Sequence, residues 1–109
     1  MPQSEYTLKI LDDARDEIHK IAKIHLELVG SHSARKITVR LRTALENLKT
    51  NPKMGIVCRE ESLALAGYRM LICGNYLCFY RQLGNSIFVY HVVDGRTDYG
   101  KLLMDLERT

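Results

Sequence analysis

The sequence lacks any long hydrophobic run. It has no stretch of about 18 consecutive apolar residues, so we expect no membrane span and no membrane partner. Its first ten residues carry neither the basic head nor the apolar core of a secretory signal. Repeats, low-complexity tracts and linker-like segments are missing as well. We therefore expect a single cytoplasmic domain over residues 1–109, a length typical of one domain.

Cysteine is scarce, and the familiar catalytic motifs are missing. The chain has three cysteines, an odd number that suits a reducing compartment better than a disulfide framework. Their spacing is not that of a CxxC metal knuckle. Phosphate-cradling glycine loops, Ser-His-Asp signatures and HExxH motifs are absent too. We expect no metal and no cofactor.

The charge that is present is mildly basic. The net charge is +3 and the isoelectric point is about 8.8. This permits an anionic partner, such as nucleic acid or an acidic protein, without requiring one. The excess positive charge is concentrated in residues 31–49, which contain five Lys and Arg residues and one acidic residue, Glu46. That surface is either an anion-binding face or the wetted side of an amphipathic helix.

The first half of the chain has helical periodicity. Residues 6–11 predict a short strand. Apolar residues at helical spacing then predict two amphipathic helices that pair as an antiparallel hairpin, with Gly30 at the break. The first stripe comprises Ile18, Ile21, Ala22, His25, Leu28 and Val29, and the second Ala34, Ile37, Leu41, Ala44, Leu45 and Leu48.

After a connector that runs to about Ala66, the period changes to two. The segments "YRMLIC", "YLCFYRQ" and "SIFVYHVV" predict three strands, separated by Gly74-Asn75 and Gly84-Asn85 turns. Asp94-Gly95 then turns the chain into a short C-terminal helix that contains Leu102 and Leu103. The predicted fold is α+β: an N-terminal strand and a two-helix hairpin packed on an antiparallel sheet of about four strands, three of them in the meander.

Two-residue turns set the strand register. Cys73 is predicted to face Tyr76. The same alignment pairs Arg69 with Tyr80, Tyr68 with Arg81, Tyr80 with Val89, and Cys78 with His91. Both faces of the sheet are then largely apolar. The helices cover one face; the other is covered either by the terminal helix and connector or by a protein partner or second copy.

Five residues are candidates for a functional site. Arg69, Arg81 and Arg96 suit phosphate binding, and nearby aromatic residues favour RNA contact; the alternative is that these arginines are solvated or paired with acids. His91 is either a general base or a packed strand residue. Tyr99 either transfers a proton beside Arg96 or ends a helix with a solvated hydroxyl.

The segment from Gly67 to Leu103 resembles the RelE/ParE superfamily of bacterial toxins. The shared pattern appears as Tyr68-Arg69, Gly74-Asn75-Tyr76, Tyr80, Gly95-Arg96, Asp98-Tyr99 and Leu102-Leu103. The preceding strand, helical hairpin and "NPKMG" segment also fit. The resemblance implies the toxin of a type II toxin–antitoxin pair, with a cognate antitoxin as its partner and a homodimer or toxin–antitoxin hetero-oligomer as its assembly.

The resemblance implies one of two mechanisms. RelE-like members are metal-independent endoribonucleases that cut mRNA on the ribosome, whereas ParE-like members inhibit DNA gyrase. The leading hypothesis is mRNA cleavage. In it Arg96 and Arg81 stabilise the phosphate, and Tyr99 or His91 transfers a proton. The alternative is a gyrase inhibitor without chemistry of its own.

The sequence departs from the ribonuclease pattern at three positions. Leu77 stands where many ribonuclease members have an arginine. Met70 and Ile72 stand where those members have lysines. These changes deplete the cationic surface that cleavage would use, and they leave open the gyrase alternative or a toxin that has lost its activity.

Overall fold

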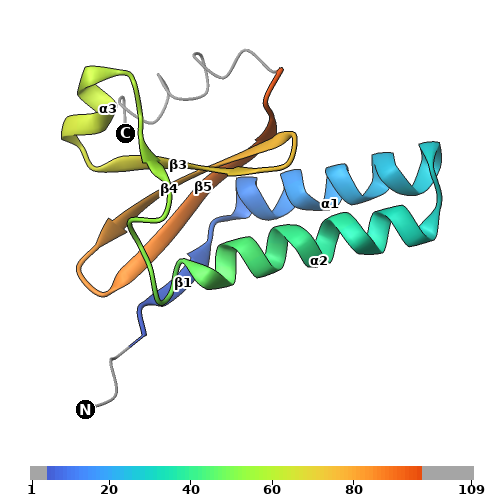
Figure 1. The fold of residues 1–109 in the computed structure, drawn as a ribbon, viewed down its shortest axis with the longest axis horizontal. Coiled ribbons are helices and arrows are strands. Elements are labelled where there is room, and N and C mark those ends of the chain that lie inside the picture. Colours follow the sequence, from blue (N-terminus) through green and yellow to red (C-terminus); the bar gives the residue numbers. More distant parts are fainter. Residues whose placement is uncertain (1–4, 97–109) are drawn as a thin grey trace.

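A computed structural model describes residues 5–96 of the chain (Figure 1). The predicted C-terminal helix lies outside the described residues. Within them, no helix is both long enough and apolar enough to cross a membrane. The elements are β1 (Thr7–Ile10), α1 (Asp12–Leu28), α2 (Ser31–Asn47), β2 (Ile56–Val57), α3 (Glu61–Leu65), β3 (Tyr68–Cys73), β4 (Tyr76–Leu83) and β5 (Ser86–Asp94).

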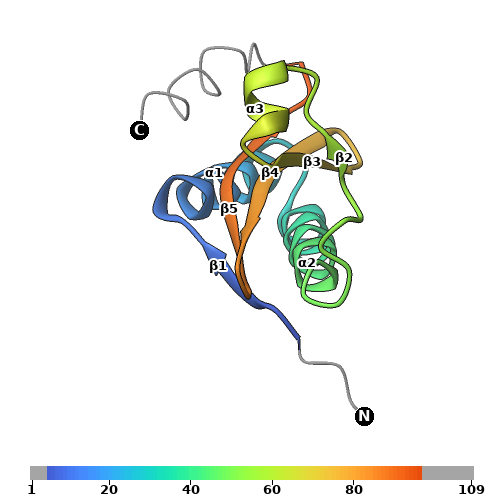
Figure 2. The same cartoon turned by 90° about the vertical axis from the view of Figure 1, so that its left-hand side faces the viewer.

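The strands form one mixed sheet in the order β1-β5-β4-β3-β2 (Figure 2). The predicted α+β architecture and the three-strand meander are confirmed. The expectation of about four antiparallel strands is wrong in two respects. The connector supplies a fifth strand, because Ile56 and Val57 pair with Met70 and Arg69. Strand β1 runs parallel to β5, because the helical hairpin between them carries the chain back before the meander begins.

Both turns of the meander have the predicted two-residue form. Gly74 and Gly84 have φ of 60° and 59°, a left-handed conformation that glycine adopts without a steric penalty. The predicted pairs from Cys73–Tyr76 to Tyr68–Arg81 are therefore present.

A β-bulge breaks the predicted register further along β5. Tyr80 faces Val89 as predicted, but Phe79 faces His91 and Cys78 faces Val92, so the expected Cys78–His91 pair is wrong. One extra residue in β5 reverses the side-chain alternation beyond it. As a result Val92, not Val93, packs in the core beneath the helices.

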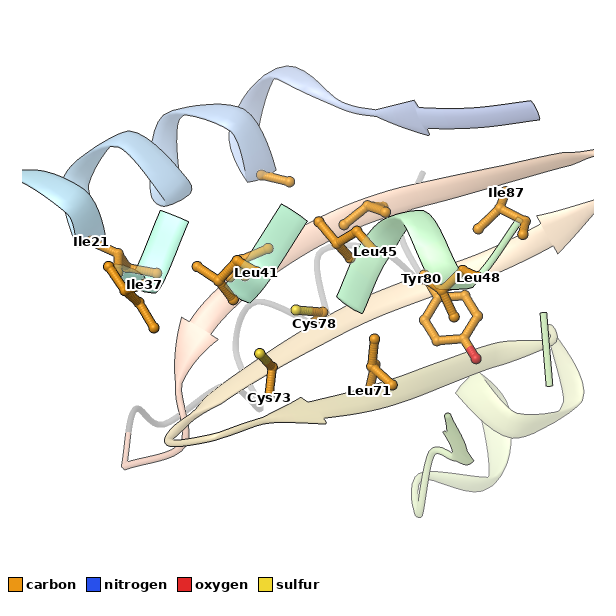
Figure 3. Packing of buried hydrophobic residues seen from close by; sticks show 13 residues of the cluster. Ile21, Ile37, Leu41, Leu45, Leu48, Leu71, Cys73, Cys78, Tyr80 and Ile87 are labelled. Atoms are coloured by element: carbon orange, nitrogen blue, oxygen red, sulfur yellow. The ribbon is translucent and has the colours of Figure 1, made fainter. Parts of the chain in front are cut away.

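The helical hairpin packs on one face of the sheet through the predicted stripes (Figure 3). Ile37, Leu41 and Leu45 are buried on α2, and Ile21 is buried on α1. Leu28, predicted to lie in the first stripe, is instead 80% exposed. The end of the hairpin extends past the sheet, where no strand lies beneath it (Figure 1).

The opposite face of the sheet carries a second, smaller core. Its buried members are Cys58, Leu63, Tyr68, Phe79 and Val93. The connector and α3 provide two of them, so part of the second apolar face is covered by the chain itself, one of the two predicted alternatives. Within residues 5–96 the remainder is not fully covered, since Ile56, Val57 and Ile72 are all at least half exposed.

Candidate functional site

Arg96 lies just beyond β5 and presents its guanidinium to solvent. Its Nη2 and Nε donate to the two carboxylate oxygens of Asp94 at 3.0 and 3.1 Å, and its backbone N–H donates to the same carboxylate at 2.9 Å. The side-chain hydrogen bond from Arg96 holds the pKa of Asp94 at about 2. The Arg96 side chain is 91% exposed. It has five N–H donors in all, so those not directed at Asp94 can meet a phosphate.

An open pocket of about 510 Å³ lies beside Arg96, between α1 and the β3–β4 turn. His25 and Tyr76 lie in its wall, together with Arg96 and Lys20. The His25 ring bridges two hydroxyls, with Nδ1 2.9 Å from Ser33 Oγ and Nε2 2.9 Å from Tyr76 OH. Burial and the Asp94 carboxylate raise the pKa of Tyr76, while Arg96 opposes them. At neutral pH this phenol is therefore protonated and available as a donor.

No functional role was predicted for the group formed by His25, Ser33 and Tyr76. Helical spacing placed His25 in an apolar stripe, and the turn placed Tyr76 at the start of a strand. Both placements were correct, since Tyr76 pairs with Cys73 and His25 packs towards the sheet. Only the angle between the helix and the sheet brings the imidazole to the phenol, and no local pattern encodes that angle.

His91 is buried beside α1. Its Nδ1 lies 3.1 Å from Oε1 of Glu17, and the same oxygen accepts a hydrogen bond from the Val92 backbone N–H at 3.1 Å. The carboxylate thus satisfies a backbone donor in the irregular part of β5. In this position the imidazole ties the bulge to α1. The acidic residue it uses was not among the predicted site residues.

Arg81 lies on the face opposite the helical hairpin. Its guanidinium stacks over the rings of Tyr68 and Tyr90, at 4.4 and 5.5 Å from their centroids. Its Nη2 donates to Tyr90 OH at 3.0 Å. Its Nε is buried and has no hydrogen-bond partner in the part of the chain that is described. Cation–π stacking of this kind holds an arginine in place against the sheet.

Arg69 is also engaged by the protein itself. Its Nη1 donates to the Gly55 carbonyl at 2.7 Å and so holds the connector against β3. Arg69 and Arg81 lie far from Arg96. Asp94 pairs with Tyr76, and Arg81 follows Tyr76 by five positions along β4, which corresponds to about 17 Å. The structure therefore does not bring the three predicted phosphate-binding arginines together. Tyr99 lies outside the described residues.

The sheet face opposite the helices is apolar at the positions that are cationic in many of the ribonucleases the chain resembles. Met70, Ile72 and Leu77 are all on this face, directed away from the helices, and Ile72 is 59% exposed. A cleft of about 370 Å³ lies between this surface and the connector, with Ile56 and Val57 in its wall. Within residues 5–96, no group of three or more side chains is arranged to hold a metal.

Comparisons with known proteins agree with one another. The family described as "ParE toxin of type II toxin-antitoxin system, parDE" matches residues 8–99. The chromosomal ParDE toxin–antitoxin system from P. aeruginosa contains a chain of similar fold, with a TM-score of 0.70 and 18% identity, covering 83% of this chain and 96% of that one. No curated protein matches the sequence.

A second solved structure has the same fold. It is the toxin–antitoxin complex RelBE2 from Mycobacterium tuberculosis, with a TM-score of 0.61 and 22% identity. The match covers 85% of this chain and 94% of that one. The shared architecture therefore extends over nearly the full length of both solved chains.

Proposed function

Because the chain belongs to the ParE toxin family of type II toxin–antitoxin systems, we propose that it arrests growth by inhibiting DNA gyrase, without chemistry of its own. The protein is the toxin of such a pair. We propose that it acts in the cytoplasm, where its cognate antitoxin holds it inactive in a hetero-oligomer.

The observation that carries this proposal is the apolar sheet face opposite the helices, where Ile72 is exposed and Met70 and Leu77 are partly buried. Cleavage of a phosphodiester builds negative charge in the transition state, and hydrogen-bond donors or cations must be positioned to meet it. Apolar side chains supply neither. Exposed apolar surface instead favours contact with a protein. Arg69 and Arg81 do not compensate, because internal contacts occupy both of them.

Endoribonuclease activity is the second candidate, and the pocket beside Arg96 favours it. An exposed guanidinium there lies near a protonated phenol and an imidazole. In this hypothesis Arg96 binds the scissile phosphate and Tyr76 or His25 transfers a proton. Tyr99 and His91 remain the alternatives proposed from the sequence. Among the described residues, the cations that line this pocket are Lys20 and Arg96, and Arg96 is paired with Asp94.

One pair of measurements separates the two candidates. The chain is induced in cells with and without the neighbouring reading frame, and mRNA 5′ ends are mapped. The purified protein is then tested for inhibition of gyrase supercoiling. We expect growth arrest, a DNA-damage response and loss of supercoiling, without new 5′ ends. New cleavage sites together with unimpaired supercoiling would exclude gyrase inhibition and support the ribonuclease.

Two arginine variants sharpen the comparison. Arg96→Ala should abolish cleavage if the second candidate is correct, since it removes the guanidinium that would bind the scissile phosphate. Arg35→Ala is the matched control, because Arg35 is an exposed arginine on α2 that does not line this pocket. Cleavage that survives Arg96→Ala would remove Arg96 from the site.

A further inference from the structure

The helical hairpin is longer than the sheet on which it packs (Figure 1). On α1, the hydrogen bond to the sheet that lies nearest the end of the hairpin joins His25 to Tyr76, at the start of β4. On α2, the Arg40 guanidinium lies beside Gly74 of the β3–β4 turn. Residues 26–36, which we call the hairpin tip, lie beyond these two contacts and belong to neither hydrophobic core.

The hairpin tip exposes large apolar side chains. Leu26, Leu28 and Val29 are 51%, 80% and 73% exposed. Leu28 follows the buried Ile21 by seven residues, about two helical turns along the same face, so it continues the stripe that α1 buries against the sheet. Exposed apolar side chains that are grouped in this way mark interaction sites, whereas single ones are ordinary.

The surface around these apolar side chains is basic. Lys23, Arg35 and Lys36 are exposed there, and the one acid in residues 23–36 is Glu27. Within residues 5–96, none of the three cations forms an ion pair. The hairpin tip therefore complements an acidic surface with an apolar recess. A second copy of the chain does not supply this, because a symmetric contact would bring two basic surfaces together.

The hairpin tip lies at the same end of the molecule as the exposed part of the sheet face opposite the helices. On that face Ile72, which is 59% exposed, pairs with Leu77 next to the β3–β4 turn. The helices leave the sheet at this same turn, through His25 and Arg40. One partner can therefore contact the sheet face and the hairpin tip together, so the partner proposed for the first surface also fits the second.

We propose that the hairpin tip is a second contact surface through which the toxin binds gyrase. Leu28 and Val29 enter an apolar recess of the enzyme, and acidic groups at its rim meet Lys23 and Lys36. The inference rests on the proposed function and adds to it a contact on the helical side of the molecule.

The test measures the toxin concentration that halves gyrase supercoiling. Leu28→Gln/Val29→Gln removes the apolar contact and should raise this concentration at least about tenfold, as expected for loss of buried anchors. Lys23→Gln/Lys36→Gln removes two charges and should raise it about threefold, with a smaller difference from the wild type at higher salt. All four side chains are exposed, and circular dichroism and thermal unfolding verify that the variants fold.

Two control variants match these changes at positions outside the hairpin tip. Val39→Gln/Leu83→Gln removes apolar side chains that are 56% and 47% exposed. Lys9→Gln/Lys53→Gln removes two exposed charges. Both controls should inhibit gyrase within about twofold of the wild type, as expected for substitutions at ordinary surface positions.

The same assay separates this inference from the proposed function. If the wild type inhibits gyrase and the tip variants inhibit it equally well, the inference is overturned and the proposed function stands. If the wild type leaves gyrase unaffected, the proposed function fails and the inference fails with it.

Two further measurements address other partners. The tip variants should bind the antitoxin purified from the neighbouring reading frame within about twofold of the wild type, as expected for substitutions outside an interface. The wild type should not bind phosphatidylglycerol vesicles. If the tip variants lose antitoxin or vesicle binding while gyrase inhibition is unchanged, the hairpin tip serves that other partner and the inference is overturned.

Discussion

Tyr80 lies in the main hydrophobic core, beneath the helices. It is fully buried, yet its hydroxyl donates to the Pro52 carbonyl at 2.7 Å and accepts from the Gly55 N–H at 2.9 Å. A Cβ added at Gly55 would lie 2.7 Å from this hydroxyl and 2.8 Å from the Met70 carbonyl. Glycine is therefore the residue that fits there, and one phenol secures the connector to the sheet.

Replacing Tyr80 by Phe tests this role. The Gly55 N–H and the Pro52 carbonyl lose a buried partner, so we expect the free energy of unfolding to fall by about 1–3 kcal/mol. Urea denaturation measures the change. Tyr6→Phe is the control, because the Tyr6 hydroxyl makes no hydrogen bond within residues 5–96. Equal stability of the two variants would contradict the role assigned to the Tyr80 hydroxyl.

Asp94 makes the stability of the fold depend on pH. Its pKa is about 2 in the folded protein, chiefly because of the Arg96 side chain, and is near ~3.9 in an unfolded chain. The pair therefore stabilises the fold above the unfolded value and loses its effect as the pH falls through about 2. NMR titration of the carboxyl should show the low pKa. In Arg96→Ala the pKa should move towards ~3.9. A pKa unaffected by Arg96→Ala would rule out the pair as its cause.

At the scale of elements, the bulge in β5 joins the sheet to α1. It turns Val92 into the helix-side core and leaves its N–H to the Glu17 carboxylate, which also meets His91. Bulges commonly redirect side chains in this way. One acidic side chain thus satisfies the irregular backbone and fixes where the first helix crosses the sheet.

Glu17→Ala should therefore destabilise the protein by about 2–4 kcal/mol, because it leaves the Val92 N–H and the His91 ring without this acceptor. Thermal or urea unfolding provides the measurement. Asp16→Ala removes the neighbouring, exposed acid on α1 and should change the stability by less than about 0.5 kcal/mol. Similar losses for both variants would indicate a general effect of helix charge instead of the contact to the bulge.

At the scale of the whole molecule, features with short-range causes were predictable. The apolar stripe of α2 and the two glycine turns follow from spacing and backbone preference, and the turns fix the register as far as Tyr80–Val89. The bulge was not predictable, because β5 carries no glycine or proline to mark it. The pairing of Ile56 and Val57 with β3 was missed because two residues are too short for a period-two pattern.

The candidate site was predictable only in part, for a similar reason. The position of Arg96 beyond the last strand follows from the Asp94-Gly95 turn. The stacking of Arg81 on Tyr68 follows from their predicted pairing, whereas the contact of His25 with Tyr76 depends on helix placement. A single sequence gives the residues available to a site. Which of them meet is decided by contacts between distant segments.

The parallel pairing of β1 with β5 determines when this edge of the sheet can form during synthesis of the chain. Thr7 pairs with Ser86, so the first strand to leave the ribosome waits for the last before its edge of the sheet can form. Contacts between residues so distant in sequence also slow folding, because a long loop must close first. The helical hairpin is translated well before the sheet is complete. An antitoxin already present in the cell would therefore have an interval in which to engage the nascent toxin before the toxin can act.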